Sequence, residues 1–499
     1  MQGEHRMRAD VVVVGGGPVG LLLAAELAGY GVDTVLLESR AVACERPKAT
    51  TLHARAVQSL ARRGHLPGDG APYAQAPAAS PFHFAGLPGL LITAPGLEPE
   101  PILKCPQLEL ERFFEERARA AGARVLRGYR ATGFAEEDGG VRVTAKGPRG
   151  GAVWHTKYVV GADGARSTVR AIAGITSDTH PATVSALTGS VVLREPDALT
   201  DGWTRTARGW IAARRDPQGR THIRTLNCGG AHMDRHRKPT LEELRKEVSC
   251  IAGRPVAMEE PRWLGRFSDF ARLARTFRAR RFFLVGDAAH VHFPIGGQGL
   301  SAGVLDALNL GWKLALAVHG SAGESLLDTY DLERRPVARK VVDNTRAQLA
   351  LMRPGSELDA LREVFAGLLA ANREHGLEDM ISAQDTVLPD PTGRTPPPAG
   401  TFLPNTRLQT DEGETDVIGL LRQGRPLLLF FGTEDSGHRA AARQWGGLLR
   451  VVQVRPRPEV PYDALLVRPD GYIAWAPGGP ALADVLSSYF AEGALAGCR

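Results

Sequence analysis

The sequence predicts an α/β fold with three parts: a large domain built on a parallel sheet, a mostly-β domain inserted into it, and a smaller α/β domain at the C-terminal end. The valine run Val11–Val14 leads into the glycine-rich segment Gly15–Gly20, a pattern typical of a buried strand that turns into a helix. A second strand with a glycine-rich loop, Arg281–Leu300, comes far along the chain. The proline-rich stretch Leu388–Pro404 is typical of a linker and sets off the last domain.

The composition is that of a globular protein with room for several domains. The chain has 499 residues, of which 43% are hydrophobic and 23% are charged. Its formal net charge is +6, but lysines and arginines are scattered, and the densest cluster is the short run Arg278–Arg281. We therefore expect no nucleic-acid partner, because a mild positive field suits an anionic nucleotide equally well.

Cysteine and histidine usage argues against disulfide and metal sites. The widely spaced cysteines form no C-x-x-C motif, which favours a reduced, cytoplasmic compartment. His290 and His292 stand two residues apart without a third ligand motif, so we expect no metal. The N-terminal residues do not resemble a signal peptide and no run of about 18 apolar residues occurs, so we expect no membrane association. The cysteines are Cys44, Cys105, Cys228, Cys250 and Cys498.

The first elements of the chain form a βαβ unit. Pro18–Tyr30 has the apolar spacing of a helix, and Gly31 can cap its end. Thr34–Leu37 is a second short apolar strand, which ends at Glu38. Strand, helix and strand in this order are typical of a parallel sheet.

The glycine-rich turn of this unit matches G-x-G-x-x-G with Gly15, Gly17 and Gly20. These glycines allow a tight turn, close approach of a pyrophosphate, and packing of the helix on the strand. The helix N-terminus adds free N–H groups and partial positive charge. Glu38 stands where a carboxylate accepts hydrogen bonds from ribose hydroxyls, and it would repel a 2′-phosphate. The unit therefore predicts a Rossmann-like domain that binds NAD or FAD.

The rest of the chain alternates between helical and strand patterns. Proline and glycine become more frequent from Leu66 to Pro106, which predicts either a long loop or an excursion of the chain into another layer. Alternation in Thr183–Trp263 predicts a mostly-β segment, read as one sheet that covers a substrate. Helices are expected at Gln107–Ala121, Leu300–Val318 and Gly323–Asn344, and strands at Val141–Ala145, Trp154–Val160, Phe282–Val285, Pro426–Gly432 and within Tyr462–Trp475. The expected domains are 1–176, with part of the substrate layer at 66–106, then the inserted β domain 177–280, the first domain continued at 281–390, and the C-terminal domain 391–499.

The later glycine-rich segment separates FAD from NAD. Asp287 follows a strand, where it can either contact a ligand or simply cap a helix. The loop Pro294–Gly299 then enters a helix, whose N-terminus would favour negative charge beside it. Because a reduced flavin carries negative charge on its ring, this loop favours a flavin.

These residues resemble the class A flavoprotein aromatic hydroxylases, which have the para-hydroxybenzoate hydroxylase fold. The resemblance runs from about Asp10 to Arg335 and includes three motifs in the family's order: the glycine turn with Glu38, Asp163-Gly164, and Gly286-Asp287. The tail sequence VRPDGYIAW is similar to the C-terminal domain of the phenol hydroxylase and aromatic polyketide hydroxylase branches. The resemblance therefore implies a thioredoxin-like domain, which without C-x-x-C would lack redox activity and would have a structural or dimer-related role.

The resemblance also implies cofactor contacts, residue by residue. Two departures affect them, because the family often has Asn where this chain has Ser301, and Gln where it has Leu305. Asp163, associated in the family with FAD and NADPH, can also be a structural turn residue; Arg46 can be a solvated arginine and Gln107 can merely start its helix. The implied FAD-binding residues are Gly15, Gly17, Val19, Gly20, Glu38 and Ser39 for the adenosine half; Arg46, Gln107, Arg112 and Asp163; Asp287 for the ribityl chain; and Pro294, Gly297, Leu300 and Ser301 for the flavin ring.

The implied reaction is an oxygen transfer centred on the flavin. NADPH or NADH would reduce FAD, O2 would form a C4a-hydroperoxyflavin, and a polycyclic aromatic polyketide would be hydroxylated, with no catalytic protein nucleophile required. Pro294 and Gly297 would lie near the reactive ring. The alternatives are a Baeyer–Villiger or antibiotic-inactivating monooxygenase, and a flavin-dependent dehydrogenase. His53 and Arg55 can lie near the flavin or substrate or serve ordinary packing, and the same choice applies to the candidate stacking residues Phe82, Phe84, Trp203 and Trp210.

Overall fold

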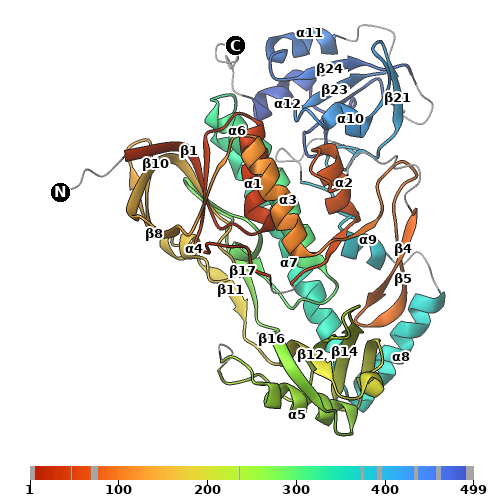
Figure 1. Cartoon of the computed structure of the whole chain (residues 1–499). Helices are drawn as coiled ribbons and strands as arrows, with labels where there is room; N and C mark the ends of the chain where they lie inside the picture. Colours follow the sequence, from red (N-terminus) through yellow and green to blue (C-terminus); the bar gives the residue numbers. More distant parts are fainter. Residues whose placement is uncertain are drawn as a thin grey trace.

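The computed structural model describes residues 6–45, 48–68, 77–234, 237–371, 376–389, 396–431, 437–456 and 462–490. The predicted cofactor residue Arg46 and the isolated Cys498 lie outside the described residues. The chain folds into a central α/β body, a separate antiparallel sheet and a C-terminal α/β domain (Figure 1). The α/β class expected from the sequence is confirmed.

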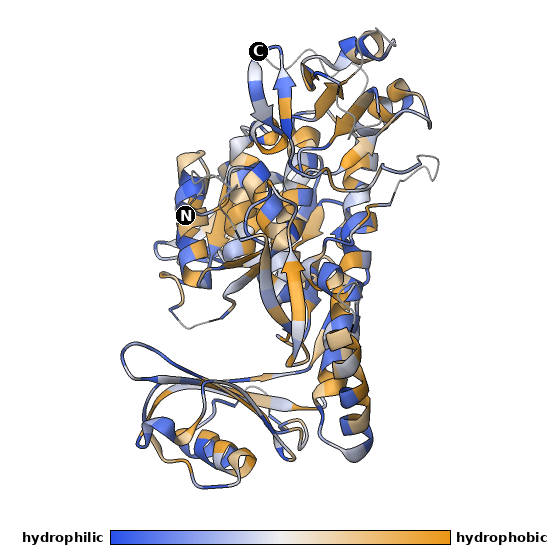
Figure 2. Ribbon diagram, turned by 90° about the vertical axis from the view of Figure 1, so that its right-hand side faces the viewer, coloured by the Kyte–Doolittle hydropathy of each residue, from blue (hydrophilic) through white to orange (hydrophobic). Residues whose placement is uncertain are grey.

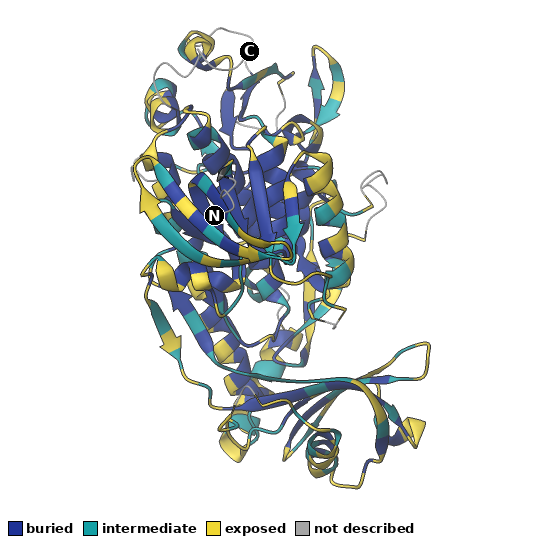
Figure 3. Cartoon of the chain, turned by 60° about the vertical axis from the view of Figure 1, so that its left-hand side comes forward, coloured by how far each residue is buried: buried dark blue, intermediate teal, exposed yellow. Residues whose placement is uncertain are grey.

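The central sheet has β1 at its middle, between parallel neighbours. Its strands run in the order β18-β19-β10-β1-β2-β7, with β9 and β8 continuing from β10. The side chains of Val11, Val12 and Val13 are fully buried, as the valine run predicts for a central parallel strand. Figure 3 shows the buried residues concentrated in these central strands. The strands are β1 (Arg6–Val14), β2 (Thr34–Glu38), β7 (Arg124–Arg127), β8 (Arg130–Glu137), β9 (Gly140–Gly147), β10 (Gly150–Gly161), β18 (Arg278–Ala279) and β19 (Phe282–Leu284).

Long helices pack around this sheet. Helix α1 contacts both α3 and α6, which explains why it is apolar all round instead of on one stripe. Helix α7 is longer than the sequence predicts, and α8 follows it towards the second sheet (Figure 1). The helices of this part are α1 (Pro18–Gly29), α2 (Ala54–Arg62), α3 (Gln107–Ala120), α4 (Thr168–Ile172), α6 (Gln298–Val318), α7 (Glu324–Met352), α8 (Ser356–Ala371) and α9 (Leu377–Ser382).

A five-stranded antiparallel sheet forms the layer predicted to cover a substrate. Its order is β13-β14-β15-β12-β16, and Figure 2 shows it as a layer apart from the central body, with long helices along one side joining the two. Its outer face packs on helix α5, which the mostly-β prediction missed. The elements are β12 (Ser185–Leu193), β13 (Gly202–Thr206), β14 (Gly209–Arg215), β15 (Thr221–Leu226), α5 (Leu241–Ala252) and β16 (Met258–Ser268), with the short 3-10 turn η2 (Pro196–Ala198) after β12.

The segment Leu66–Pro106 contains strands, so of its two readings the excursion into another layer is right and the plain long loop is wrong. Strands β4 and β5 form a hairpin, and β6 pairs with β3. A small sheet of β11, β17 and β20 connects the central body to the five-stranded sheet. The strands are β3 (Thr51–His53), β4 (Ala79–Phe84), β5 (Leu87–Thr93), β6 (Ile102–Lys104), β11 (Ser177–His180), β17 (Ala271–Ala274) and β20 (His290–Val291).

The C-terminal domain is built on a four-stranded sheet in the order β24-β23-β25-β26. Strands β23 and β24 are parallel, whereas β25 runs antiparallel to β23 and β26. This order supports the thioredoxin-like assignment, which stays a prediction. No cysteine lies among the described residues of this domain. Its elements are β21 (Arg407–Thr410), β22 (Gly413–Asp416), α10 (Val417–Leu421), β23 (Leu427–Phe430), α11 (His438–Ala442), η4 (Arg443–Trp445), β24 (Arg450–Gln453), β25 (Ala464–Val467), β26 (Ile473–Trp475) and α12 (Leu482–Tyr489).

A buried ion network fastens this domain to the central body. Arg468, just after β25, donates hydrogen bonds of 2.8 Å to both carboxylate oxygens of Glu333 in α7. Lys313 of α6 donates to the same carboxylate at 2.7 Å, and Asp470 also accepts from Arg468. Although burial acts to raise it, Arg468 and Lys313 lower the pKa of Glu333 to about 2. The network therefore stays charged at neutral pH.

Candidate active site

The N-terminus of α1 opens onto free space. Gly15 has a φ of +116°, and a Cβ there would lie 2.2 Å from the carbonyl oxygen of Ala162, so only glycine fits. Gly20 is equally confined, because its Cβ would lie 2.1 Å from the carbonyl oxygen of Gly15. Gly17 differs: it is the N-cap of α1, no side chain caps it, and its Cβ position meets nothing within 4 Å. The helix thus presents uncapped N–H groups to an open space that can receive an anion.

Glu38 stands beside this turn at the carboxyl end of β2. Its Oε2 accepts a hydrogen bond of 2.7 Å from the Gly16 N–H, and its Oε1 accepts from the Arg40 N–H at 2.7 Å. The Ser39 hydroxyl donates to the same Oε1 at 3.3 Å. These contacts hold the carboxylate next to the turn, where the dinucleotide pattern requires an acceptor for ribose.

Asp163 has one oxygen in use and one free. Its Oδ2 accepts from the backbone N–H groups of Thr168, at 2.6 Å, and Val169, at 3.2 Å, at the start of α4. Its Oδ1 is buried and has no hydrogen-bond partner among the described residues. The Asp163 Cα lies 2.9 Å from the Cβ position of Gly15. The turn role is therefore present, and an unpartnered acceptor beside the glycine turn remains for a ligand.

Asp287 points its carboxylate out of a buried surrounding. It lies in the short turn η3 (Gly286–Ala288), whose other two residues are buried, yet Asp287 itself is exposed. Within the described chain it makes no hydrogen bond or ion pair, so the alternative that it caps a helix is wrong. Gly286 packs against Val19 of α1, with 3.4 Å between its Cβ position and Val19 Cγ2. The structure thus brings the two distant glycine-rich segments together.

The loop Pro294–Gly299 turns into α6 through two glycines with positive φ, Gly296 at +72° and Gly297 at +65°. His53 of β3 contacts both this loop and the start of α6. Its Nε2 lies 2.8 Å from the Gly296 carbonyl oxygen, and its backbone N–H donates a hydrogen bond of 3.0 Å to Ser301 Oγ. The Ser301 side chain therefore connects β3 to α6, a structural role that the sequence motif did not indicate. Pro294 is exposed and Leu300 is buried.

His53 is neutral and keeps one acceptor free. A carbonyl oxygen only accepts, so the Nε2 that faces Gly296 carries the proton. Burial lowers the pKa of His53 to about 4. Its Nδ1 is buried without a hydrogen-bond partner in the described part of the chain. His53 is fully buried against the loop before α6, and its place near the flavin or substrate stays a prediction.

Asp306 positions the turn that carries Asp287, and sequence reasoning missed it. Its Oδ2 accepts from the Gly286 N–H at 3.1 Å and lies 2.8 Å from His290 Nε2, while its Oδ1 accepts from Arg334 at 2.8 Å. All of these groups are buried. Burial acts to raise the pKa of Asp306, but His290 and Arg334 lower it. The signal in the sequence was an acid inside the apolar α6 helix, which needs a buried partner.

Comparison with known proteins settles the family. A family model described as "FAD binding domain" matches residues 8–345, and one described as "Aromatic-ring hydroxylase, C-terminal" matches residues 396–493. The chain belongs to the FAD-binding aromatic-ring hydroxylases. The match covers both glycine-rich segments and the C-terminal domain.

Relatives of this hydroxylase are named for rifampicin, for anhydrotetracycline and for angucycline biosynthesis. It is 37% identical to a rifampicin monooxygenase of Streptomyces venezuelae over 94% of this chain and 95% of that protein. It is 35% identical to a 12-dehydrotetracycline 5-monooxygenase/anhydrotetracycline 6-monooxygenase of Streptomyces rimosus subsp. rimosus, over 98% of this chain and all of that one. The solved structure of CabE, an aromatic hydroxylase from angucycline biosynthesis, superposes with a TM-score of 0.87 at 33% identity, over 97% and 99% of the two chains.

The described residues of the hydroxylase fit FAD. The open N-terminus of α1 has the unpartnered Asp163 Oδ1 beside its glycine turn, and the turn that carries the exposed Asp287 packs against Val19 of the same helix. Each supplies a donor or acceptor that the protein itself leaves unused. This is the arrangement that an extended dinucleotide requires.

Other predicted residues have contacts of their own. Gln107 accepts from the Ala49 N–H at 3.4 Å and donates to Glu111 at 2.7 Å, at the start of α3. Arg112 is exposed, and no side-chain contact of it occurs in the described structure. Of the two readings of Arg55, the structure shows ordinary packing, because its guanidinium lies 3.8 Å over the ring of Phe402, towards the C-terminal domain. Ser301 and Leu305, the two departures from the family pattern, border a small cavity of about 20 Å³.

The candidate stacking residues divide between core and surface. Phe84 and Trp210 are buried in an apolar cluster, so core packing is their role. Phe82 is half-buried and lies edge-on to His53 at 5.0 Å between ring centres. Trp203 is 44% exposed and lies 5.6 Å from the ring of His83. Phe82 and Trp203 thus remain available to a ligand.

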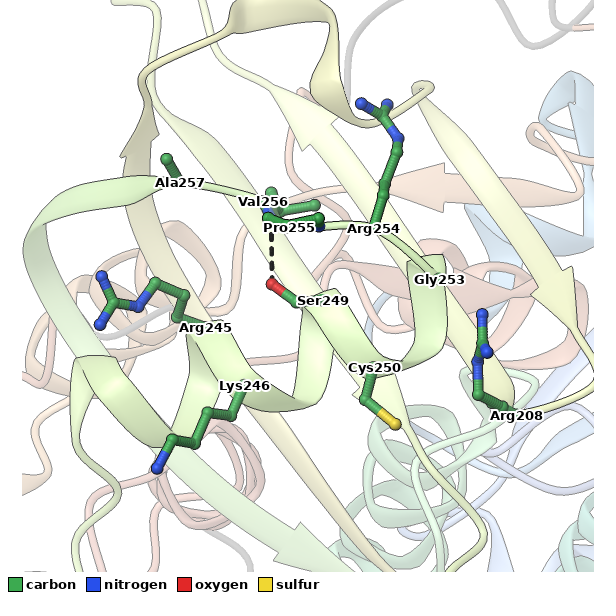
Figure 4. Close-up of a pocket in the computed structure, with 10 residues that line it drawn as sticks. All are labelled: Arg208, Arg245, Lys246, Ser249, Cys250, Gly253, Arg254, Pro255, Val256 and Ala257. Carbon is green, nitrogen blue, oxygen red and sulfur yellow. Dashed lines mark hydrogen bonds between the residues drawn. The ribbon is translucent and has the colours of Figure 1, made fainter.

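A depression of about 670 Å³ lies elsewhere, on the outer side of α5 (Figure 4). Arg208, Arg245 and Arg254 line it, and none of the predicted site residues does. Among the described residues, no group of three or more His, Cys, Asp or Glu is placed to hold a metal ion. No helix in the described ranges is both long and apolar enough to cross a membrane.

Proposed function

We propose that this hydroxylase uses NADPH or NADH and O2 to hydroxylate a polycyclic aromatic polyketide. One observation carries the proposal: the loop before α6 lies under a sheet that presents the exposed ring of Trp203. A flat aromatic substrate would lie between the two. The substrates printed in the relatives' names, rifampicin and anhydrotetracycline, support this substrate class.

The proposed roles follow from the contacts. The open N-terminus of α1 would bind the pyrophosphate, Glu38 a ribose, and Asp287 the ribityl chain. The N-terminus of α6 would stabilise negative charge near the ring. Bound FAD supplies the redox and oxygen chemistry, while the chain provides position and exclusion of water. His53 would keep the loop in place as a neutral donor at neutral pH, since burial lowers its pKa to about 4.

The test starts from the purified protein supplied with FAD and 18O2. We expect a yellow protein whose NADPH oxidation is stimulated by anhydrotetracycline or another polycyclic phenol, and a product with one labelled oxygen. A product that has lost two hydrogens and gained no label would show a dehydrogenase instead. Parallel assays with NADPH and NADH identify the reductant.

A second candidate is the Baeyer–Villiger or antibiotic-inactivating oxygenation, which the rifampicin monooxygenase at 37% identity favours. Rifampicin is therefore included among the substrates. A new phenol in the product supports hydroxylation, and a lactone or ester supports oxygen insertion into a carbon–carbon bond.

We further propose that the enzyme acts in the reduced cytoplasm on a small molecule, without nucleic-acid or membrane partners, and that it forms a homodimer. The four described cysteines are free, which suits a reduced compartment. Light scattering on the holoenzyme tests the dimer, and a monomer mass would contradict it.

A further inference from the structure

One face of the five-stranded sheet looks towards the loop before α6. Trp210 and Leu226, from β14 and β15, share an apolar cluster with Phe293 and Ile295, which flank Pro294 in that loop. Trp210 also donates a hydrogen bond of 2.6 Å from Nε1 to the carbonyl oxygen of Met352 at the end of α7. The face that carries Trp210 is therefore the inner face, and α5 covers the outer one.

Arg214 and Arg224 lie on this inner face without a counter-charge. In the register of β14 and β15, Ala212 is opposite Arg224 and Arg214 is opposite His222, so the two arginines are diagonal neighbours on the face that carries Trp210. Both side chains are exposed and make no ion pair or hydrogen bond within the described structure. Five other arginines in or beside these strands form ion pairs, and Arg262 of β16 shares with Arg214 and Arg224 the lack of one within the described residues. The five pairs are Arg194–Glu259, Arg205–Asp359, Arg215–Asp197, Arg220–Glu260 and Arg266–Glu243.

Lys104 belongs to the central body, and the rings of Phe82 and His83 connect it to Trp203 on this sheet face. Lys104 lies on β6 opposite Thr51, and its Nζ donates to Thr51 Oγ1 at 3.0 Å. Thr51 in turn lies against the loop, because its Cβ is 3.3 Å from the Cβ position of Gly297. Burial lowers the pKa of Lys104, and the charge of Arg214 lowers it further. Burial also lowers the pKa of Arg224, although its side chain keeps exposed area.

Aromatic rings accompany the three cations. Lys104 lies 5.7 Å from the ring of Phe82, which stacks on His83 at 4.8 Å, and His83 touches Trp203 at 5.6 Å. Trp203 is on the same sheet face, opposite Ala212. No described carboxylate forms an ion pair with Lys104, Arg214 or Arg224. Such a set of like charges is unfavourable by itself and becomes favourable when an anion joins it.

We propose that Arg214, Arg224 and Lys104 form a subsite for an ionised oxygen acid, a carboxylate or acidic enol, carried by the aromatic substrate whose rings lie against Trp203. The inference rests on the proposed function and narrows its substrate class to acidic aromatics. Phosphate groups of the pyridine nucleotide share the same chemistry. The aromatic rings that surround the cations, and the nearness of Lys104 to the loop before α6, favour the substrate.

The test compares two matched probes on the FAD-loaded protein: anthraquinone-2-carboxylate and 2-(hydroxymethyl)anthraquinone. Calorimetric titration should show the carboxylate binding about tenfold more tightly or better, as expected for charge-assisted hydrogen bonds. Arg224→Gln and Arg214→Gln should each weaken the carboxylate about fivefold or more and leave the neutral probe within about twofold. Arg245→Gln, on the outer side of α5, is the matched control and should change neither.

NADPH titrations distinguish the two groups that could bind these cations, the acid of the aromatic substrate and the phosphates of the pyridine nucleotide. An unchanged NADPH dissociation constant in Arg224→Gln and Arg214→Gln supports the substrate subsite. Equal binding of the two probes, or loss of NADPH binding with the carboxylate unaffected, would overturn it. FAD content, read from the visible spectrum, is measured separately. An FAD-loaded protein that prefers the carboxylate but transfers no labelled oxygen to a polycyclic phenol would support the anion subsite and count against the proposed function.

Discussion

The glycines of the nucleotide turn are alike in the motif but differ in what they do. The backbone conformation at position 15 requires glycine, because φ is +116° and a Cβ at Gly15 would have no room. Gly17 has an ordinary φ of −78° and empty space beside it. Because the protein places nothing there, the smallness of Gly17 serves the ligand and not the fold.

Gly17→Ala should therefore separate cofactor binding from stability. We expect the melting temperature of the apo-protein to stay within about 2 °C and the affinity for FAD to fall about tenfold or more, because the methyl group enters the space in front of α1. Gly29→Ala, in the last turn of the same helix and also without a neighbour within 4 Å, is the control and should bind FAD normally. Equal FAD affinity in both variants would contradict the assignment.

Asp287→Asn tests the other half of the cofactor site. The exposed carboxylate has no protein partner to lose, so we expect an intact fold. Loss of a charged acceptor for the ribityl chain should weaken FAD retention about tenfold or more. The measurement is flavin content after gel filtration, with Asp138→Asn, in the turn after β8, as the control. Undiminished flavin in Asp287→Asn would refute its role.

At the scale of elements, a buried ion cluster joins α1 to the end of α2. Glu26 of α1 accepts from Arg63 at 3.1 Å and lies 2.6 Å from His65 Nε2, with its side chain fully buried. Burial alone would raise its pKa, but Arg63 and His65 lower the pKa of Glu26 from 4.5 to about 2. The carboxylate therefore stays ionised and holds the connection between two helices that the βαβ pattern does not link.

This cluster predicts a specific acid sensitivity. A depressed folded-state pKa contributes stability above pH 4.5, and that contribution is lost as the pH falls towards 2. The contribution is on the order of 3 kcal/mol. In urea titrations, Glu26→Gln should be much less stable than wild type at pH 7, and the difference should shrink below pH 4.5. A difference that is constant from pH 7 to 3 would contradict this account.

At the scale of the whole molecule, a buried ion network links the C-terminal domain to the central body, and we expect the two to unfold as one cooperative unit. Arg468 reaches from one to the other, and its guanidinium is shared between Glu333 and Asp470 in a buried setting. Removing one member of such a buried network is costly, since the remaining charges lose their partner.

Arg468→Met should uncouple the two parts. Losing one partner of a buried pair costs about 3–5 kcal/mol. Differential scanning calorimetry should then show one transition in wild type and two in Arg468→Met. Arg407→Met, at an exposed ion pair, is the control and should behave as wild type. Two transitions in the wild-type protein would contradict the coupling.

Sequence patterns predicted the elements that have strong periodicity or a fixed turn. The βαβ unit and the α6 helix are where the patterns place them, because buried parallel strands and glycine turns leave clear local signals. Helix α5 was missed inside a β-rich segment. Its signals were present: Thr240 caps the helix by accepting from the Glu243 N–H at 3.1 Å, and Gly253 ends it in the left-handed region.

The sequence by itself determined the α/β class, the nucleotide turn and the family, since these depend on residues close together along the chain. Only the tertiary structure decided which distant groups meet: Asp306 with Gly286, Arg55 with Phe402, and His53 with Gly296. The physical reason is that a side chain's charge and shape are readable from the sequence, whereas its partners depend on how whole layers pack. The second glycine-rich segment illustrates both kinds of information. Its residue pattern predicted a flavin site, whereas only the fold placed the turn that carries Asp287 beside α1.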